Sequence, residues 1–316
     1  MKLSEIYAKG AENLKKKKLL FYLQGVETEF VLEHNEEIFK RFKFLQKAIG
    51  SKPASTETTL LGVNLKTPIT MSSVSMPIPQ IAENGLLQVA QGVREAGSVM
   101  WTGSPLPKNL DELVRTGVPL VQTIKPYEDR GRIFQEIETA ERAGVMAVGV
   151  EVDAGQGTKI RDQIMASGCT PISVGELREI KEAVKTPLVL KGVLSPWDAE
   201  KSLEVGADLI VVSNHGAHTI DSLPHPLEVM DEIVKVIDGR IPIMVDGGFR
   251  RGTDVLKGLA FGAQAVGIVR PILYGLAANG KEGVREVLDQ MTSELRRTMT
   301  MVGIRSPAEV KRDILL

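Results

Sequence analysis

Short apolar segments recur along the chain at fairly even spacing, and charged residues return with a helical period between them. Eight of these segments have the length of buried strands, and they span residues 69–72, 98–101, 119–122, 145–152, 188–191, 209–213, 243–246 and 265–269. A helical period marks residues 131–143, 175–184, 196–204, 226–237 and 253–261. This alternation indicates parallel strands joined by right-handed crossovers.

Eight such strands predict closure into a (β/α)₈ TIM barrel over residues 66–316, with an open doubly wound sheet as the alternative. Residues 1–65 precede the first strand, and we expect a helical segment there, charged around residues 40–52, that closes one end of the barrel. No linker or low-complexity tract interrupts the sequence. The whole of residues 1–316 is therefore predicted to be one domain.

The overall charge narrows the class of partner. Lys and Arg number 39 against 40 Asp and Glu, a net charge of -1, so no broad field favours nucleic acid or an anionic membrane. The single cysteine, Cys169, excludes an intramolecular disulfide and a cysteine-cluster metal site. No apolar run approaches the roughly 20 residues that span a bilayer. We expect a cytoplasmic protein, without a metal, that acts on a small molecule.

Polar residues and glycines end four consecutive predicted strands. They are Lys191-Gly192, Ser213-Asn214-His215-Gly216, Asp246-Gly247-Gly248 and Val269-Arg270-Pro271. The carboxyl ends of the strands meet on one rim of such a barrel, and catalytic groups lie there. The sequence therefore predicts a site on this rim.

The last two of these segments favour a phosphate site. Gly247 and Gly248 allow close backbone approach, while Arg250 and Arg270 offer charge-assisted hydrogen bonds next to helix starts. A tight turn with no ligand is the alternative interpretation of the glycines. No Gly-x-Gly-x-x-Gly unit joins a strand to a helix, so a terminal phosphate such as that of FMN is favoured over a dinucleotide.

Lys191 and His215 are the reactive candidates. A lysine at the end of an apolar strand needs a negative group opposite it, which a reduced flavin ring supplies. A histidine at a strand end serves as a general base near neutral pH, although a lone histidine is often structural. Asp153, just after the fourth strand, is placed to orient the imidazole.

With these motifs the chain resembles the FMN-dependent α-hydroxy acid oxidase and dehydrogenase family. The similarity is most specific from Lys191 onward and includes the segments 213–216, 246–255 and 270–278. It implies an enzyme that binds FMN and oxidises an α-hydroxy acid or a related alcohol to the keto product. It also implies a homo-oligomer, a tetramer or octamer. Two alternatives remain open: an isomerase that uses reduced FMN without net oxidation, and a flavin-binding protein that has lost catalysis.

The resemblance also assigns roles by position. His215 is the implied base, Asp153 its partner, and Lys191 a contact of the flavin ring. The remaining implied cofactor contacts are Ser73, Val74, Ser75, Gln122, Glu151, Asp246, Gly247, Gly248, Arg250, Val269 and Arg270.

Several positions depart from the family pattern, and most of them belong to the substrate site. His218 stands where an arginine binds the substrate carboxylate, and Arg161 is the one displaced candidate for the second such arginine. Two substrate tyrosines are expected to be replaced by Phe21 and by Ile124 or Lys125. Glu151 replaces a threonine and Val269 a glycine, and the connection between 153 and 188 is short. We therefore expect a conserved flavin site beside an altered substrate site. A protonated His218 would restore part of the missing charge near pH 6.

Overall fold

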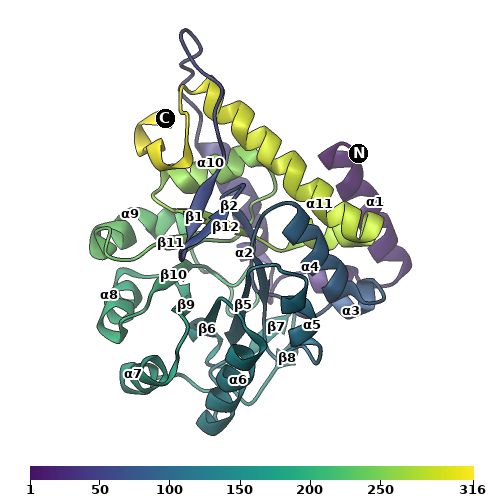
Figure 1. Cartoon of the computed structure of the whole chain (residues 1–316), viewed down its shortest axis with the longest axis vertical. Coiled ribbons are helices and arrows are strands. Elements are labelled where there is room, and N and C mark those ends of the chain that lie inside the picture. Colours follow the sequence, from purple (N-terminus) through teal and green to yellow (C-terminus); the bar gives the residue numbers. More distant parts are fainter.

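Eight parallel strands form the centre of the computed structural model, which describes all residues 1–316 (Figure 1). Each strand overlaps one predicted segment. In chain order they are β3 (Ile69–Met71), β4 (Met100–Thr102), β5 (Leu120–Ile124), β6 (Ala147–Glu151), β9 (Leu188–Val193), β10 (Leu209–Val212), β11 (Ile243–Val245) and β12 (Ala265–Ile268).

The sheet closes on itself. Its pairing order is β3-β12-β11-β10-β9-β6-β5-β4, with every pair parallel. The end strands β3 and β4 meet where the Met71 amide donates to the Val99 carbonyl at 3.0 Å and Ser98 Oγ donates to the Ile69 carbonyl at 2.6 Å. The prediction of a (β/α)₈ barrel is confirmed, and the open sheet is excluded.

Helices surround the barrel (Figure 1). The main ones are α4 (Gly85–Glu95), α5 (Leu110–Arg115), α6 (Arg130–Ala143), α7 (Val174–Ala183), α8 (Pro196–Val205), α9 (Pro226–Ile237), α10 (Gly252–Ala260) and α11 (Arg270–Met301). Local sequence explains where several begin, because Asp129, Ser173 and Ser195 each accept a hydrogen bond from a first-turn amide. A short helix, α3 (Ile78–Ile81), precedes α4. No helix combines the length and apolarity that crossing a membrane requires.

A β-hairpin fills the amino-terminal end of the barrel. It consists of β1 (Thr58–Leu60) and β2 (Val63–Leu65), and its buried Leu60 and Leu65 pack on the apolar barrel interior around Trp101. The opposite, carboxyl end of the barrel is therefore the one left open for a site.

The amino-terminal segment is helical only as far as Arg41. It contains α1 (Leu3–Lys16), α2 (Phe30–Glu37) and two 3₁₀ turns, η1 (Leu20–Leu23) and η2 (Ile38–Arg41). The expectation of a helical segment over 1–65 is thus wrong for 42–65, because residues 42–57 form no helix and residues 58–65 form the hairpin. Alternating burial, with Leu60 and Leu65 inward, suits a strand rather than a helix.

The two halves of this helical segment pack against different parts of the barrel. α1 packs along α11 (Figure 1), where Asn13 donates to the Ala277 carbonyl at 2.9 Å. Residues 20–37 instead lie on the carboxyl rim, where the Val26 amide donates to the Ala217 carbonyl at 2.8 Å.

The short connection between β6 and β9 forms a second hairpin, β7 (Thr158–Ile160) with β8 (Gln163–Ala166). Its backbone is tied to both neighbouring rim segments. The Lys159 amide donates to the His218 carbonyl at 2.8 Å, and the Arg161 amide donates to the Gly25 carbonyl at 2.7 Å. Three segments distant in sequence therefore meet above the open end of the barrel.

Candidate active site

A cavity of about 370 Å³ lies at the carboxyl ends of the strands. Its wall includes the segment after β3 (72–77), the glycine loop after β11 (246–250), residues 267–270 and the β7–β8 hairpin. Glu151, Lys191 and His215 also line it. The rim predicted to hold the site is the rim with the cavity.

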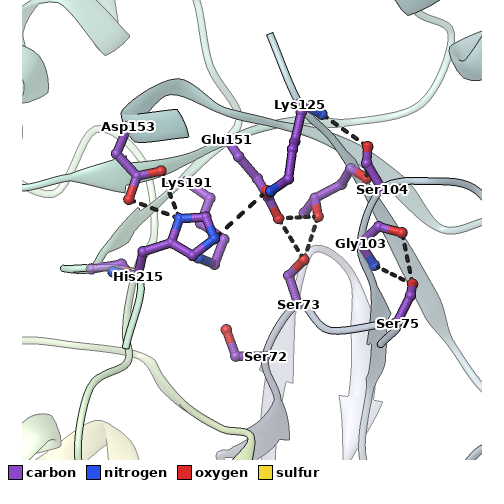
Figure 2. Close-up of polar contacts among 12 residues, drawn as sticks. Ser72, Ser73, Ser75, Gly103, Ser104, Lys125, Glu151, Asp153, Lys191 and His215 are labelled. Atoms are coloured by element: carbon purple, nitrogen blue, oxygen red, sulfur yellow. Dashed lines mark hydrogen bonds and ion pairs between the residues drawn. The ribbon is translucent and has the colours of Figure 1, made fainter. Parts of the chain in front are cut away.

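The His215 imidazole is held by Asp153 (Figure 2). Its Nδ1 lies 2.9 Å from both carboxylate oxygens of Asp153, so Nδ1 carries the proton that it donates and Nε2 is left as an acceptor. His215 has a left-handed backbone with φ 55°, which directs the chain sharply away after β10. The predicted pair therefore forms, with a free basic nitrogen.

Gly192 makes room for Asp153. A Cβ atom on this glycine would lie 2.2 Å from Asp153 Cγ, and the glycine φ is +94°. Both the close approach and the backbone conformation require glycine here.

Lys191 lies behind His215 and is almost fully buried. Its Nζ is 3.9 Å from Asp246 Oδ2. Burial alone would lower the pKa of this lysine, but the carboxylates of Asp246, Asp153 and Glu151 more than offset that effect and raise its pKa. The side chain is therefore a buried cation at the base of the cavity.

Asp246 has one satisfied and one unsatisfied oxygen. Ser72 Oγ donates to Oδ2 at 2.5 Å, whereas Oδ1 is buried without a hydrogen-bond partner. A buried carboxylate oxygen normally accepts at least one hydrogen bond. A ligand hydroxyl group in the cavity would supply it, which fits the sugar-alcohol chain of FMN.

The glycine loop has the expected backbone. Gly247 and Gly248 have φ of +109° and +76°, and a Cβ on Gly248 would lie 1.9 Å from the Asn35 carbonyl oxygen. Gly248 is therefore required by packing against α2 as well as by any ligand. Val269 lines the cavity directly before α11, so free amides of a helix start face this region.

Both predicted phosphate arginines reach the cavity wall, and each also has a protein partner. Arg250 donates to Glu36 at 2.9 Å, and Arg270 donates to the carbonyls of Leu23 and Gly216 at 3.0 and 3.1 Å. Burial lowers the pKa of Arg270 to about 10, with a smaller contribution from Arg250. Two cations at this rim suit a phosphate group, so the residues present fit FMN.

Ser73, Val74 and Ser75 line the cavity as predicted, but Gln122 does not. The Gln122 side chain is buried beneath it, where Oε1 accepts from Thr102 at 2.6 Å and Nε2 donates to the Thr123 carbonyl at 2.7 Å. The structure therefore leaves Gln122 without direct access to a ligand.

Glu151 forms a buried ion pair with Lys125 (Figure 2). Lys125 Nζ donates to Oε2 at 2.7 Å, while Oε1 accepts from Ser73 and Thr123 at 2.7 and 2.8 Å. Burial would raise the pKa of this carboxyl group, yet the ammonium groups of Lys125 and Lys191 hold the pKa well below its usual value. Glu151 is therefore ionised, 3.8 Å from His215 Nε2.

The two residues expected to bind a substrate carboxylate do not provide a cationic pair. His218 lines the cavity, but its Nε2 donates to the Gln24 carbonyl at 2.9 Å, and burial with nearby Arg270 and His215 lowers its pKa to about 3. The expectation that His218 gains charge near pH 6 is wrong. Arg161 lies outside the cavity and pairs with Glu29 at 2.7 Å.

Other cavity residues were missed or misplaced by sequence reasoning. Tyr22, not its neighbour Phe21, lines the cavity, and Tyr127 and Lys159 also contribute to the wall. The aromatic pair at 21–22 was a usable signal, but nothing local distinguishes its two members. For Lys125 the sequence predicts only that it, or Ile124, stands in place of a substrate tyrosine.

A barrel whose open rim joins a histidine–aspartate pair to a glycine loop with two arginines defines the class of flavin-dependent (β/α)₈ oxidoreductases. Comparison with known proteins agrees. The sequence profile of the FMN-dependent dehydrogenase family matches residues 10–170 and 156–316. A 2-hydroxyacid oxidase of Dictyostelium discoideum is 31% identical, over 99% of this chain and 89% of that protein. Glycolate oxidase 3 of Arabidopsis thaliana is 32% identical, over 95% of this chain and 92% of that protein.

Solved structures give the same result. Mandelate oxidase superposes with a TM-score of 0.90 at 27% identity, covering 100% of this chain and 97% of that chain. The chain belongs to the FMN-dependent dehydrogenase family. The predictions of FMN as cofactor and of an FMN-dependent hydroxy-acid oxidoreductase are confirmed at the level of this family.

Proposed function

We propose that the protein oxidises a 2-hydroxy acid to the 2-oxo acid, with His215 as the base. The observation that carries this proposal is the contact of His215 Nδ1 with both Asp153 oxygens at 2.9 Å, which fixes the tautomer and leaves Nε2 free beside the cavity. Nε2 takes up the proton of the substrate hydroxyl, and Asp153 stabilises the resulting imidazolium. Bound FMN would accept the hydrogen of the substrate α-carbon together with its two electrons, as a hydride equivalent.

The other cavity residues hold the cofactor in this proposal. Lys191 stabilises negative charge at the flavin ring, and Asp246 accepts a hydrogen bond from the ribityl chain through Oδ1. Arg250, Arg270 and the loop at 247–248 bind the phosphate. Ser73, Val74, Ser75 and Glu151 line the cavity and would contact the ring, whereas Gln122 would act only through its packing beneath.

The experiment is anaerobic mixing of the FMN-loaded protein with a panel of 2-hydroxy acids while flavin absorbance is recorded. At least one acid should bleach the flavin without any other reductant. His215→Asn should slow this step by about 10²- to 10⁴-fold with normal FMN content, since a general base is lost. His34→Asn is the control, because His34 pairs with Glu228 outside the cavity. Bleaching by no acid, or undiminished bleaching in His215→Asn, would overturn the proposal.

The cytoplasmic location and the homo-oligomer of four or eight subunits expected from the sequence remain part of this proposal. A lone buried cysteine suits a reducing compartment. Large exposed apolar side chains, among them Phe30, Ile164, Trp197 and Ile220, suit contacts between subunits. Light scattering after size-exclusion chromatography measures the subunit number, and a monomer would contradict the oligomer.

A further inference from the structure

Lys125, the ion-pair partner of Glu151, has no role yet in cofactor binding or in proton transfer. Both side chains are buried, with 9% and 3% of their surface exposed, and both line the cavity. Burying two charges is unfavourable unless their remaining hydrogen-bonding capacity is used. The free capacity of this pair therefore indicates what else it binds.

That capacity lies on the lysine. Glu151 has both oxygens engaged, Oε1 by two hydroxyl groups and Oε2 by Lys125. The Lys125 ammonium has three N–H donors, and Glu151 is its one hydrogen-bond partner in the protein. Two buried donors are thus available to a ligand with acceptor oxygens.

The other cations around the cavity are already committed. Arg250 and Arg270 are assigned to the cofactor phosphate, and Lys159 pairs with Glu27 at 3.0 Å. Arg132 stacks 3.5 Å above the Tyr127 ring and pairs with Glu136. Lys191 faces Asp246 behind His215 and is assigned to the flavin ring.

Lys125 also lies on the reacting side of His215. Glu151 Oε2 is 2.7 Å from Lys125 Nζ and 3.8 Å from His215 Nε2, so the ammonium and the free imidazole nitrogen share one neighbour. In a 2-hydroxy acid the hydroxyl and the carboxylate are on adjacent carbons. A molecule that places its hydroxyl at Nε2 can therefore bring its carboxylate to Lys125.

We propose that Lys125 binds the substrate carboxylate and that Glu151 positions the ammonium for this contact. The inference rests on the proposed oxidation of a 2-hydroxy acid. A single ammonium is a point charge without the planar fork of arginine, and the adjacent Glu151 carboxylate opposes a second negative group. The site should therefore discriminate an acid from its uncharged amide less strictly than an arginine pair does.

The test compares one 2-hydroxy acid from the panel with its primary amide, using parent protein and Lys125→Met. The variant should raise the KM for the acid about 10- to 100-fold, the effect of losing a charge-assisted hydrogen bond, while the KM for the amide changes little. The maximal rate of flavin reduction should stay within a few-fold. Lys125→Arg, which keeps the charge, should recover most of the affinity for the acid.

Two further measurements keep the result interpretable. Lys181→Met removes a lysine that pairs with Asp208 away from the cavity, and it should leave both KM values unchanged. The double variant Lys125→Met with Glu151→Gln removes both charges of the buried pair. It tests the loss of affinity for the substrate carboxylate if Lys125→Met alone does not fold. Binding of the matching 2-oxo acid, followed by the flavin spectrum, should weaken in parallel with the KM.

The outcomes separate the two proposals. If neither the acid nor the amide reduces the flavin of the parent protein, the proposed function fails. If the parent is reduced by the acid while Lys125→Met and the double variant keep the parental acid-to-amide ratio, the inference about Lys125 alone is overturned.

Discussion

Replacement of Gly192 by alanine should break the contact between Asp153 and His215 although neither of these two residues is replaced. The new Cβ would lie 2.2 Å from Asp153 Cγ and 2.6 Å from Asp153 Cβ. Because Cβ is fixed to the backbone, a change of side-chain rotamer cannot relieve the second contact. The segment carrying Asp153 must therefore shift, and the 2.9 Å contacts with His215 Nδ1 should be lost.

Two contributions, backbone strain and overpacking, set the expected loss of stability in Gly192→Ala. An alanine at the φ of +94° costs about 1–2 kcal/mol in backbone strain, and the overpacking adds about 1–3 kcal/mol. The free energy of unfolding should therefore fall by about 2–5 kcal/mol. Loss of the oriented base should slow anaerobic flavin reduction by about 100-fold or more.

Gly206→Ala is the matched control. Gly206 has a φ of +82°, but the nearest atoms to its Cβ belong to the Lys181 side chain at 3.9 Å. It should show the strain of about 1–2 kcal/mol in urea unfolding and no change in flavin reduction. A folded, FMN-loaded Gly192→Ala protein that reduces its flavin at the parental rate would refute the reasoning.

Two other predictions concern the cofactor and pH. Asp246→Asn removes the charge that faces Lys191 and replaces one of the two acceptor oxygens by an NH2 donor. The Kd of the apoprotein for FMN, measured by fluorescence quenching, should therefore rise about 10- to 100-fold, and an unchanged Kd would contradict the fit of the cavity to FMN. Burial lowers the pKa of His218 to about 3 and that of His225 to about 4, from 6.5. The unfolded chain therefore takes up protons that the folded chain does not, and stability should be lost as pH falls from 6.5 toward 4, by about 1–2 kcal/mol per histidine at pH 5. His218→Gln keeps a hydrogen-bond donor to the Gln24 carbonyl, and it should reduce the pH dependence of the free energy of unfolding measured in urea. An unchanged pH dependence would show that His218 is not buried in neutral form.

The sequence by itself determined the barrel and the flavin half of the site. Eight apolar segments set the strands, because a strand buried on both faces must be apolar over its length. Lys191 and Asp246 end such segments and His215 lies just beyond one, and the carboxyl ends of parallel strands necessarily meet on one rim. Their proximity could therefore be predicted without coordinates. Gly248 was predicted too, although its contact with Asn35 was not.

The tertiary structure alone decided the substrate half. Arg161 turns outward to Glu29, Tyr22 rather than Phe21 lines the cavity, and Lys125 meets Glu151 across two neighbouring strands. Such outcomes depend on side-chain direction and on contacts between segments far apart in the chain, such as 20–29 with the β7–β8 hairpin. The charge of His218 depends on them as well, since burial and two neighbouring side chains decide whether its imidazole is protonated. Periodicity places a backbone in an element, but the environment that those contacts create sets the chemistry of each side chain.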